Sequence, residues 1–394
     1  MELKLAKWRR RRGIRPILKA LGADQGLVRY VGGAVRDELL GLPGHDIDLA
    51  TRIRPDEVVQ RLEAAGIKAV PTGIEHGTVT AVSEGQAVEV TSLRRDVSTD
   101  GRRATVAFTD DWQEDAARRD FTINALSADP ITGEIFDYFG GLDDIRARRV
   151  RFIGKPEARI AEDHLRILRF FRFHARFGAG EPDPQALAAC TARANDLMAL
   201  SRERIADELL KLLGLPDPAP TVAIMLSRGI LTPVVPEIEA SALPSLGRVI
   251  AAEAEANIEP DAPRRLSALL PPDALLAEKI AARLKLSNKM RKRLACAANR
   301  DLGTNAEALT YRAGMKCAVD RLLLAGKAAE AASVMNWQIP KLPIGGGTLI
   351  ARGLTEGPVV ARTLQAIEDR WIAAGFPKGD AFERIVTDAL AAAR

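Results

Sequence analysis

The stretch YVGGAVRDELLGLPGHDIDLAT, residues 30–51, places a glycine pair and a short helical segment between two strand-like apolar runs. Gly32 and Gly33 carry no side chains, so backbone N–H groups at the start of the helix can approach a phosphate. Arg36, in the first turns of that helix, can reach the same phosphate. We therefore expect a strand, a helix, a turn and a second strand at Leu27–Val31, Ala34–Leu40, Gly41–Gly44 and Asp46–Ala50.

Asp46 and Asp48 are two residues apart on the second predicted strand. Side chains at this spacing point to the same face of a strand. Such a carboxylate pair can bind two divalent cations roughly 3.5–4 Å apart, as two-metal phosphoryl transfer requires. A glycine pair before a helix, or an isolated D-x-D in a solvated turn, is each common by itself. Their order within one short stretch favours the functional interpretation.

The pattern around this stretch predicts a small mixed α/β unit that is followed by helices. Residues 94–112 are polar and weakly patterned, which predicts a long loop. Beyond residue 156 Ala and Leu dominate, and Ser201 is placed to cap a helix. We expect helices at 13–24, Pro55–Ala65, Glu157–Phe177 and Ser201–Leu213, and strands at Ile67–Val70, Gly77–Val82, Gln86–Leu93 and Phe121–Leu126.

Composition indicates a soluble globular chain of two to four domains, because 394 residues exceed one ordinary core. The chain has 57 Lys and Arg against 52 Asp and Glu, a net charge of +5, which permits a nucleic-acid partner. No uncharged apolar run approaches ~20 residues, so we expect no membrane partner. The sequence carries no signal for an oligomeric state.

Cys190, Cys296 and Cys317 are the three cysteines of the chain. They form no C-x-x-C pair and are odd in number. We therefore expect neither a disulfide nor a zinc site, and a location in the reducing cytoplasm.

A second polar motif, RRDFTINAL, occupies residues 118–126. Arg119, Asp120 and Asn124 supply a guanidinium, a carboxylate and an amide, which together suit a triphosphate and a ribose with its 2′-hydroxyl. A charged segment that leads into an apolar strand would look the same. By itself this motif does not decide between the two interpretations.

The third motif, EDHLRILRFFR, occupies residues 162–172. On one continuous helix, Asp163, Arg166 and Arg169 share a broad face because each step of three falls about 60° short of a turn. Arg172 lands nearly opposite Asp163 and is free to meet a phosphate or a neighbouring helix. The alternative is an ordinary i,i+3 ion pair on a solvated face, which contributes only a few tenths of a kcal/mol.

Together these motifs resemble those of the class II tRNA nucleotidyltransferase and bacterial poly(A) polymerase family, a branch of the polymerase-β-like nucleotidyltransferases. The resemblance implies an α+β protein in which a nucleotidyltransferase head with a small mixed sheet precedes an all-α neck, body and tail. On this basis we expect the head at residues 1–155, the neck at 156–215, and a tRNA-binding body and tail at 216–394.

The resemblance also implies the roles of individual residues. Asp46 and Asp48 are expected to bind two Mg²⁺ ions and to be catalytic, and Asp163 with Arg166 to read the incoming base. The full set expected to bind the nucleotide is Gly32, Gly33, Arg36, Arg119, Asp120, Asn124, Asp163, Arg166, Arg169 and Arg172. Two features stay open: Glu89 is a third metal ligand or an exposed glutamate, and the basic run at 285–293 binds tRNA phosphates or is solvated.

The function we expect is template-independent addition of the 3′-terminal CCA of tRNA from CTP and ATP, with release of pyrophosphate. An enzyme that adds only CC or only A, or a poly(A) polymerase, is the alternative within the same fold. The strand HGTVT at residues 76–80 resembles the tRNA-specific branch, and the arginine-rich string typical of poly(A) polymerases is missing. A non-catalytic RNA-binding protein is a further alternative, which intact Asp46 and Asp48 disfavour.

Overall fold

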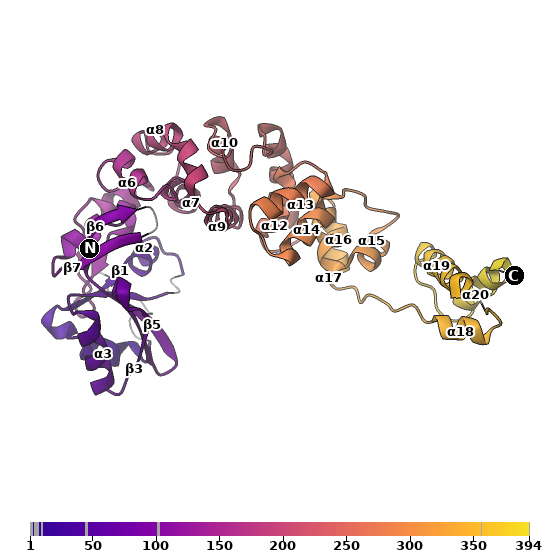
Figure 1. Ribbon diagram of the computed structural model, residues 1–394, viewed down its shortest axis with the longest axis horizontal. Helices are drawn as coiled ribbons and strands as arrows, with labels where there is room; N and C mark the ends of the chain where they lie inside the picture. The colour runs from indigo at the N-terminus through magenta and orange to yellow at the C-terminus, as the bar shows by residue number, and fades with distance from the viewer. Residues whose placement is uncertain are drawn as a thin grey trace. The chain divides into compact units, whose positions relative to one another are not determined.

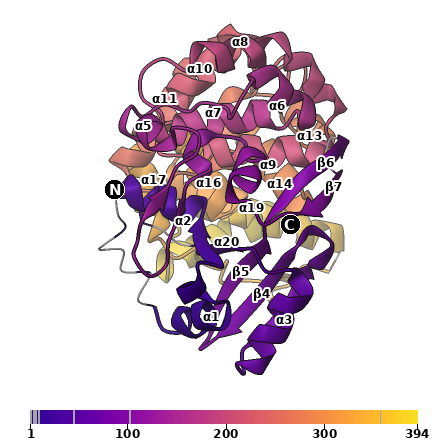
Figure 2. The ribbon, with the colours of Figure 1, turned by 90° about the vertical axis from the view of Figure 1, so that its left-hand side faces the viewer.

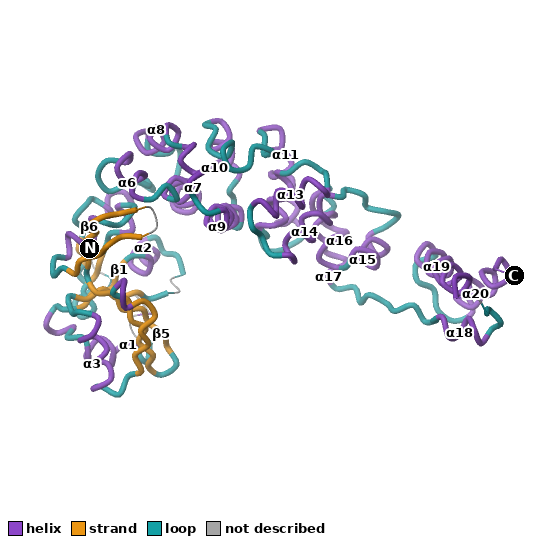
Figure 3. The backbone as a smooth tube through the Cα atoms, in the orientation of Figure 1, coloured by secondary structure: helices purple, strands orange, loops and turns teal. Residues whose placement is uncertain are grey.

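The computed structural model describes residues 3, 8, 11–43, 46–100, 103–355 and 357–393. The chain divides into two compact units, residues 1–209 with 227–234 and residues 210–226 with 235–394. All strands among the described residues belong to the first unit, and the second unit is helical, as the colours of Figure 3 show. Figure 1 gives the labels of the elements.

A seven-stranded mixed sheet in the order β3-β4-β5-β2-β1-β8-β9 forms the first unit's framework. Strands β2 and β5 are parallel, and the other neighbouring strands are antiparallel. Helices α1 (Ile14–Ala20) and α3 (Pro55–Ala64) pack against β4 (Figure 2). The strands are β1 (Val28–Val31), β2 (Asp48–Thr51), β3 (Lys68–Gly73), β4 (Thr78–Ser83), β5 (Gln86–Ser92), β8 (Ser127–Ala128) and β9 (Ile135–Phe136).

The second strand of the opening stretch begins at Asp48, so the expectation of a strand from Asp46 is wrong at its start. Strand β1 ends at Val31, which pairs with Asp48, because Gly32 turns the chain into α2 (Gly33–Leu39). Asp46 therefore has no partner on β1. Ile47 is nevertheless buried while Asp46 is exposed and Asp48 half-buried, so the alternation of a strand continues through these three residues.

The expectation of an irregular loop at residues 94–112 is also wrong. Strands β6 (Arg94–Asp100) and β7 (Arg103–Phe108) pair antiparallel as a separate two-stranded sheet, and α4 (Trp112–Ala117) follows. Backbone pairing defines this hairpin, and such pairing does not require the apolar periodicity on which the sequence prediction relied. Gly101 and Arg102, between the two strands in sequence, lie outside the described residues.

The single helix expected at Glu157–Phe177 is two helices, α6 (Pro156–Glu162) and α7 (Arg166–Phe177). Asp163 between them is extended, with φ −154° and ψ 108°. Its carboxylate accepts a hydrogen bond from the backbone N–H of Leu165 at 3.1 Å, and such a local bond competes with the helical hydrogen bonds. The strand expected at Phe121–Leu126 is likewise replaced, by the 3₁₀ turn η4 (Thr122–Asn124) before β8.

Aromatic packing fixes α7 against the segment that carries the second motif. The ring of Phe121 lies 5.0 Å from that of Phe173 and 4.9 Å from that of Phe152. Phe152 in turn stacks on Phe170 at 5.8 Å, and all four rings are buried. Other elements of this unit are η2 (Ala23–Gln25), η3 (Ile74–His76), α5 (Gly141–Arg146), α8 (Pro184–Ala192), η5 (Ala194–Ala199) and the N-terminal part of α9 (Arg202–Leu213).

The helices beyond α9 are packed around apolar clusters. One cluster surrounds Leu322 and Leu323, and another surrounds Trp371. None of the described helices is both long enough and apolar enough to cross a bilayer. These elements are α10 (Ala219–Ser227), η6 (Ala240–Ala242), α11 (Leu243–Glu255), α12 (Ala262–Leu269), α13 (Ala274–Arg283), α14 (Asn288–Ala298), α15 (Ala306–Ala313), α16 (Met315–Leu324), α17 (Ala328–Met335), α18 (Gly346–Ala351), α19 (Gly357–Ala373) and α20 (Asp380–Ala393).

Cys296 on α14 and Cys317 on α16 form a disulfide, so the expectation that the cysteines stay unpaired is wrong for these two. Their Cα atoms are 6.1 Å apart because α14 packs against α16. The two residues are 21 positions apart in sequence, and their spacing does not reveal this tertiary contact. Cys190 is a buried thiol, and burial raises its pKa.

Candidate active site

One cavity of about 470 Å³ in the first unit brings residues of all three motifs together. Six arginines and three aspartates line it, so its charge favours an anionic ligand. The lining residues are Gly32, Gly33, Arg36, Asp48, Arg118, Arg119, Asp120, Asn124, Asp163, Leu165, Arg166, Arg169, Phe173 and Arg204. Larger cavities lie elsewhere, but none of them carries these motifs.

Gly32 has a steric reason to be glycine, whereas Gly33 has none. Its φ of +65° is unfavourable for other residues, and a Cβ there would lie 3.1 Å from Nη1 of Arg119. A Cβ on Gly33 would meet only ordinary contact, with Nη2 of Arg36 at 3.6 Å. Gly32 thus lets the backbone pass close to Arg119 at the wall of the cavity.

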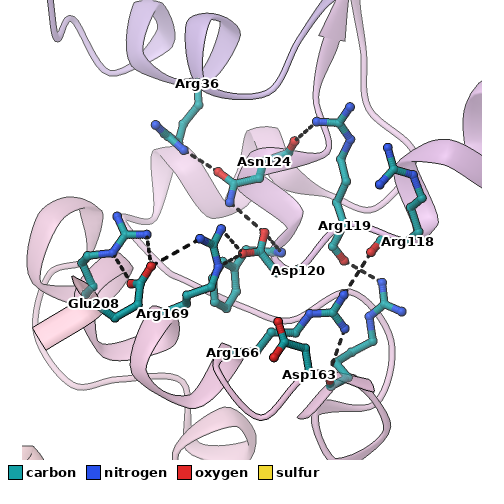
Figure 4. Close-up of polar contacts among 12 residues, drawn as sticks. Arg36, Arg118, Arg119, Asp120, Asn124, Asp163, Arg166, Arg169 and Glu208 are labelled. Carbon is teal, nitrogen blue, oxygen red and sulfur yellow. Dashed lines mark hydrogen bonds and ion pairs between the residues drawn. The ribbon is translucent and has the colours of Figure 1, made fainter. Parts of the chain in front are cut away.

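A chain of polar contacts joins the first motif to the second and third (Figure 4). Arg36 donates from Nη1 to the side-chain oxygen of Asn124, whose amide donates to Asp120 at 2.9 Å. Asp120 also accepts two hydrogen bonds from Arg169 on α7, at 2.9 and 2.6 Å. Asp37 holds Arg36 from the other side at 2.6 Å. The first strand–helix turn, η4 and α7 are therefore fixed to one another through charged groups.

Asp120 is ionised at neutral pH although it is largely buried. Burial disfavours its charged form, but Arg169 and the hydrogen bonds from Asn124 and the Phe121 N–H outweigh that effect. The pKa of Asp120 consequently lies below its ordinary value. At neutral pH the carboxylate is thus an anion that holds Arg169 at the edge of the cavity.

This lowered pKa makes a prediction for stability. An Asp with a lower pKa in the folded than in the unfolded chain stabilises the fold above its unfolded pKa of about 3.9. That stabilisation is lost as the pH falls through the folded-state pKa. Asp120→Asn should therefore lower the free energy of unfolding at about pH 7, and its difference from the parent should shrink below about pH 4.

Urea unfolding of both proteins across this pH range measures the difference directly. Asp56→Asn, which changes an exposed carboxylate on α3, is the matched control and should have little effect at any pH. A difference between Asp120→Asn and the parent that stayed constant with pH would show that ionisation of Asp120 does not stabilise the fold.

Arg118 and Arg119 are held by Asp115, a residue that the sequence did not single out. Asp115 contacts Arg118 at 2.9 Å and Arg119 at 3.2 Å, and it is buried. Arg119 also donates to the carbonyl of Asn124 at 3.3 Å. The acidic run before the motif, which includes Asp115, was the available signal for this contact.

The two expected base-reading residues are each held by a partner of their own. Asp163 forms an ion pair with Arg204 on α9 at 2.7 Å. Arg166 binds Glu162 and donates to the carbonyl of Arg159 at 2.9 Å. Asp163 lies outside helix α7, so the prediction that Asp163 and Arg166 share a helix face is wrong. Both side chains nevertheless line the same cavity. Sequence reasoning missed Arg204.

Arg172 does not line the cavity. It points to α9, where its Nε contacts Glu208 at 2.6 Å. Glu208 also lies 3.7 Å from Nη1 of Arg169. Arg172 therefore connects α7 to α9 and does not contact the cavity.

The carboxylates of the first motif lie at one end of the sheet. In the parallel pair of β2 and β5, Asp48 is opposite Glu89, which is exposed. Burial raises the pKa of Asp48, and the charges of Glu89 and Asp46 raise it further, against the opposing effect of Arg119. This crowding of negative charge suits a cation. The sequence alone does not decide whether Glu89 is a metal ligand or an exposed glutamate, because it does not show that Glu89 pairs with Asp48.

The donor set fits Mg²⁺ in one particular way. Among the described residues, no three His, Cys, Asp or Glu side chains are arranged to bind a metal by themselves. Mg²⁺ commonly uses one or two carboxylates and takes its other ligands from water and substrate phosphates. Asp46 and Asp48 can supply that contribution, so these residues fit an ion that arrives with a triphosphate.

Comparison with known proteins identifies the domains to which these motifs belong. Residues 28–151 match the family model "Poly A polymerase head domain". Residues 181–241 match "Probable RNA and SrmB- binding site of polymerase A". Together with the fold, these matches define the class of the first segment as a nucleotidyltransferase head, and they show that a segment similar to the RNA-binding site of polymerase A follows it.

Named relatives narrow the class. The chain is 44% identical over 204 residues to CCA tRNA nucleotidyltransferase 1, mitochondrial, of Homo sapiens, which is 51% of this chain and 47% of that protein. It is 41% identical over 203 residues to the CCA-adding enzyme of Staphylococcus saprophyticus, 50% of this chain and 49% of that one. The chain thus spans about half the length of the curated relatives it matches.

A solved structure extends the likeness over almost the whole chain. The Bacillus stearothermophilus CCA-adding enzyme in complex with CTP superposes with a TM-score of 0.75 and 26% identity, over 95% of this chain and 97% of that one. By its matched segments and its fold, the chain is similar to CCA-adding enzymes and poly(A) polymerases.

Proposed function

We propose that this protein is a template-independent RNA nucleotidyltransferase that builds or repairs the CCA end of tRNA from CTP and ATP. The observation that carries the proposal is the single cavity in which Asp48, the second motif and the pair Asp163–Arg166 meet. The relatives named above are CCA-adding enzymes, which supports the same activity. The division into head, neck, and tRNA-binding body and tail remains part of this proposal.

The carboxylates would hold the metal ions. We propose that Asp46 and Asp48, with Glu89 beside them, bind two Mg²⁺ ions together with the triphosphate. When bound, the ions lower the pKa of the attacking 3′-hydroxyl and neutralise charge on the phosphates. Asp46 and Asp48 thereby set where the 3′ end of the RNA must lie for in-line attack on the α-phosphorus.

Arginines would hold the triphosphate in the cavity. Arg36 and Arg119 lie on either side of the glycine pair, and each is oriented by contacts with Asn124. Guanidinium groups fixed in this way match phosphate oxygens in geometry and charge. Arg169, held by Asp120, would meet the sugar or the phosphates from α7. Pre-oriented cations stabilise the charge that develops on the leaving pyrophosphate.

Asp163 and Arg166 would choose the base. Arg204 fixes the Asp163 carboxylate, and Glu162 fixes the Arg166 guanidinium, so neither has to be ordered when a nucleotide binds. Each still has hydrogen-bonding capacity, because a carboxylate offers about four acceptor positions and a guanidinium five donors. The cavity thus presents an acceptor and a donor to the edge of a base.

The test uses tRNA transcripts that end before CCA, after the first C and after the second C. Each is incubated with Mg²⁺ and with CTP or ATP alone, and the products are resolved at single-nucleotide length. We expect CTP to extend the first two transcripts and ATP to extend only the third. If only the CTP reactions gave extension, the protein would be a CC-adding enzyme, and if only the ATP reaction on the third transcript did, an A-adding enzyme. A long run of A would identify a poly(A) polymerase. No extension would contradict the proposal.

The hairpin of β6 and β7 gives a prediction for the change from C to A addition. It is a two-stranded sheet separate from the main one, and it connects to the site through Asp115, which accepts from the Arg94 N–H. Removing residues 100–103 should impair A addition more than C addition, because the switch requires part of the site to move. Single-turnover rates for both steps measure this. Equal loss of both steps, or no loss, would exclude a selective role for the hairpin.

We also propose a cytoplasmic location, where tRNA, CTP and ATP are together available. The Cys296–Cys317 disulfide makes the redox state a direct check, because disulfides are rare in reducing compartments. Cell fractionation combined with thiol labelling would report both. Recovery in an oxidising compartment would exclude a cytoplasmic location.

A further inference from the structure

A second cavity, of about 660 Å³, lies wholly within the second unit. The last residues of α12, the residue Arg300 after α14, and the C-terminal end of α16 form part of its wall. None of its lining residues belongs to the active-site cavity. Three arginines face it: Arg248, Arg300 and Arg321.

Arg300 is a half-buried cation whose hydrogen bonds are mostly unmet. Its single hydrogen bond to the described residues runs from Nη2 to the carbonyl of Ser267, at 2.7 Å. Its Nη1 is buried without any partner among them. A guanidinium has five N–H donors, and a buried unpaired donor is costly. Burial lowers the pKa of Arg300, and no carboxylate compensates.

Arg321 and Arg248 add positive charge to the same cavity. Arg321 is held by backbone carbonyls, from Nε to Cys296 at 2.8 Å and from Nη1 to Asp301 at 3.1 Å. Arg248 is exposed, and the described residues offer it no ion pair. The disulfide joins α14 to α16, which steadies the wall that carries Arg300 and Arg321.

Two carboxylates also line the cavity, and they are too few to neutralise its three arginines. Glu237 is engaged by Arg283, with contacts of 2.8 and 2.5 Å, and this ion pair lowers its pKa. Glu239 is exposed and accepts a hydrogen bond from the Ser241 hydroxyl at 3.4 Å. The cavity therefore keeps an excess of positive charge.

We propose that this cavity binds a phosphate group of RNA, with Arg300 as its main ligand and Arg248 and Arg321 beside it. The inference rests on the proposed function, which makes tRNA the partner. Arginine is the residue best suited to phosphate, because its donors match pairs of phosphate oxygens. The match to the RNA-binding domain ends at residue 241 and so includes Glu237, Glu239 and Ser241 of this wall. A free phosphate anion would satisfy the same chemistry, and the experiment separates the two sources.

Two variants test the cavity, and a third controls for net charge. Arg300→Met removes the main ligand but keeps an aliphatic chain, and Arg248→Met changes an exposed side chain that the fold does not depend on. Lys279→Met removes one charge from an exposed side chain on α13, outside the cavity and outside the basic run at 285–293. For each full-length protein, the Kd for a tRNA transcript that lacks CCA is measured at several salt concentrations. Calorimetry with inorganic phosphate forms the second arm.

Arg300→Met should weaken tRNA binding about tenfold, as expected for the loss of one charged hydrogen-bonding group. The slope of log Kd against the logarithm of the salt concentration should decrease by about one, as expected for the loss of one phosphate contact. Arg248→Met should give a smaller change in the same direction, and Lys279→Met less than either. The kcat at saturating tRNA should stay at the parent value while the KM for tRNA rises.

If Arg300→Met lost binding of inorganic phosphate but kept its affinity for tRNA, the cavity would be a site for free phosphate. That result would overturn the proposal that it binds RNA. Unchanged binding of both in Arg300→Met and Arg248→Met would overturn the proposal. Binding is read without catalysis, so weaker tRNA binding would support the site even if the parent added no nucleotide. Conversely, normal CCA addition with unchanged tRNA affinity in the variants would overturn the site and leave the proposed function standing.

Discussion

Asp48→Ala should reduce nucleotide addition by about a thousandfold or more, and Asp46→Ala should do the same. Phosphoryl transfer depends on cationic charge at the triphosphate. We propose that Asp46 and Asp48 bind the metal ions that supply this charge. Asp48 lies at the start of β2, lines the cavity and is crowded by Glu89 and Asp46. Its replacement relieves that repulsion, so we expect the fold to be retained or slightly stabilised.

Single-turnover extension of a tRNA that ends in CC, at saturating Mg²⁺ and ATP, measures the loss. Glu63→Ala removes an exposed carboxylate from α3 in the same unit and should retain parental activity. Thermal unfolding of each variant checks that the loss is chemical. Near-normal extension by either aspartate variant would show that the metal ligands lie elsewhere.

The second large effect concerns the choice of base. Cytosine and adenine each present an amino donor beside a ring nitrogen that accepts, whereas uracil and guanine present a carbonyl acceptor beside an N–H donor. Asp163 is an acceptor when ionised, and Arg166 is a donor at any working pH. A fixed acceptor beside a fixed donor therefore fits C and A, and meets U and G with like against like.

The size of the preference follows from the cost of mispairing. A mispaired buried polar group costs about 1–3 kcal/mol, and more when it is charged. Two such groups correspond to discrimination of about a hundredfold or more. Replacing both Asp163 and Arg166 by Ala should lower kcat/KM for CTP and ATP and remove most of their advantage over UTP and GTP.

Extension by one nucleotide with each of the four triphosphates measures this preference. The control replaces Asp143 and Arg146 on α5 by Ala, because these exposed residues have the same i,i+3 spacing and lie outside the cavity. The double variant of Asp163 and Arg166 would contradict this account if it discriminated between the bases as sharply as the parent. The two residues would then only form ion pairs with Arg204 and Glu162. The base would then be read by another part of the cavity.

The elements that could be predicted from the sequence are those in which local pattern and tertiary role agree. Helix α3 has Pro at its first position, buried Val58 and Leu62 on one face, and Gly66 after its end. The strands β1 and β2 contain apolar runs, and the turn after β1 has a positive φ at Gly32, which glycine favours. In such segments the residues needed for the fold are also those that make the pattern.

The features that could not be predicted depend on contacts between distant residues. The break at Asp163 arises from a bond between its side chain and the Leu165 N–H, and Arg204, 41 positions away, holds the same carboxylate. Helical periodicity carries neither piece of information. The pairing of Asp48 with Glu89, the hairpin of β6 and β7, and the Cys296–Cys317 disulfide likewise require knowledge of which segments are neighbours.

The central claim is that this one cavity selects C, C and A in turn without a template and then stops. It is tested most directly by one reaction, in which a tRNA transcript that lacks CCA is incubated with Mg²⁺ and all four nucleoside triphosphates. The 3′ ends are then sequenced, with Asp48→Ala protein as the blank. We predict ends that consist of CCA and nothing longer in the parent reaction, and unextended transcript in the blank. Ends that contain U or G, a continuing run of A, or no extension by the parent would contradict the account.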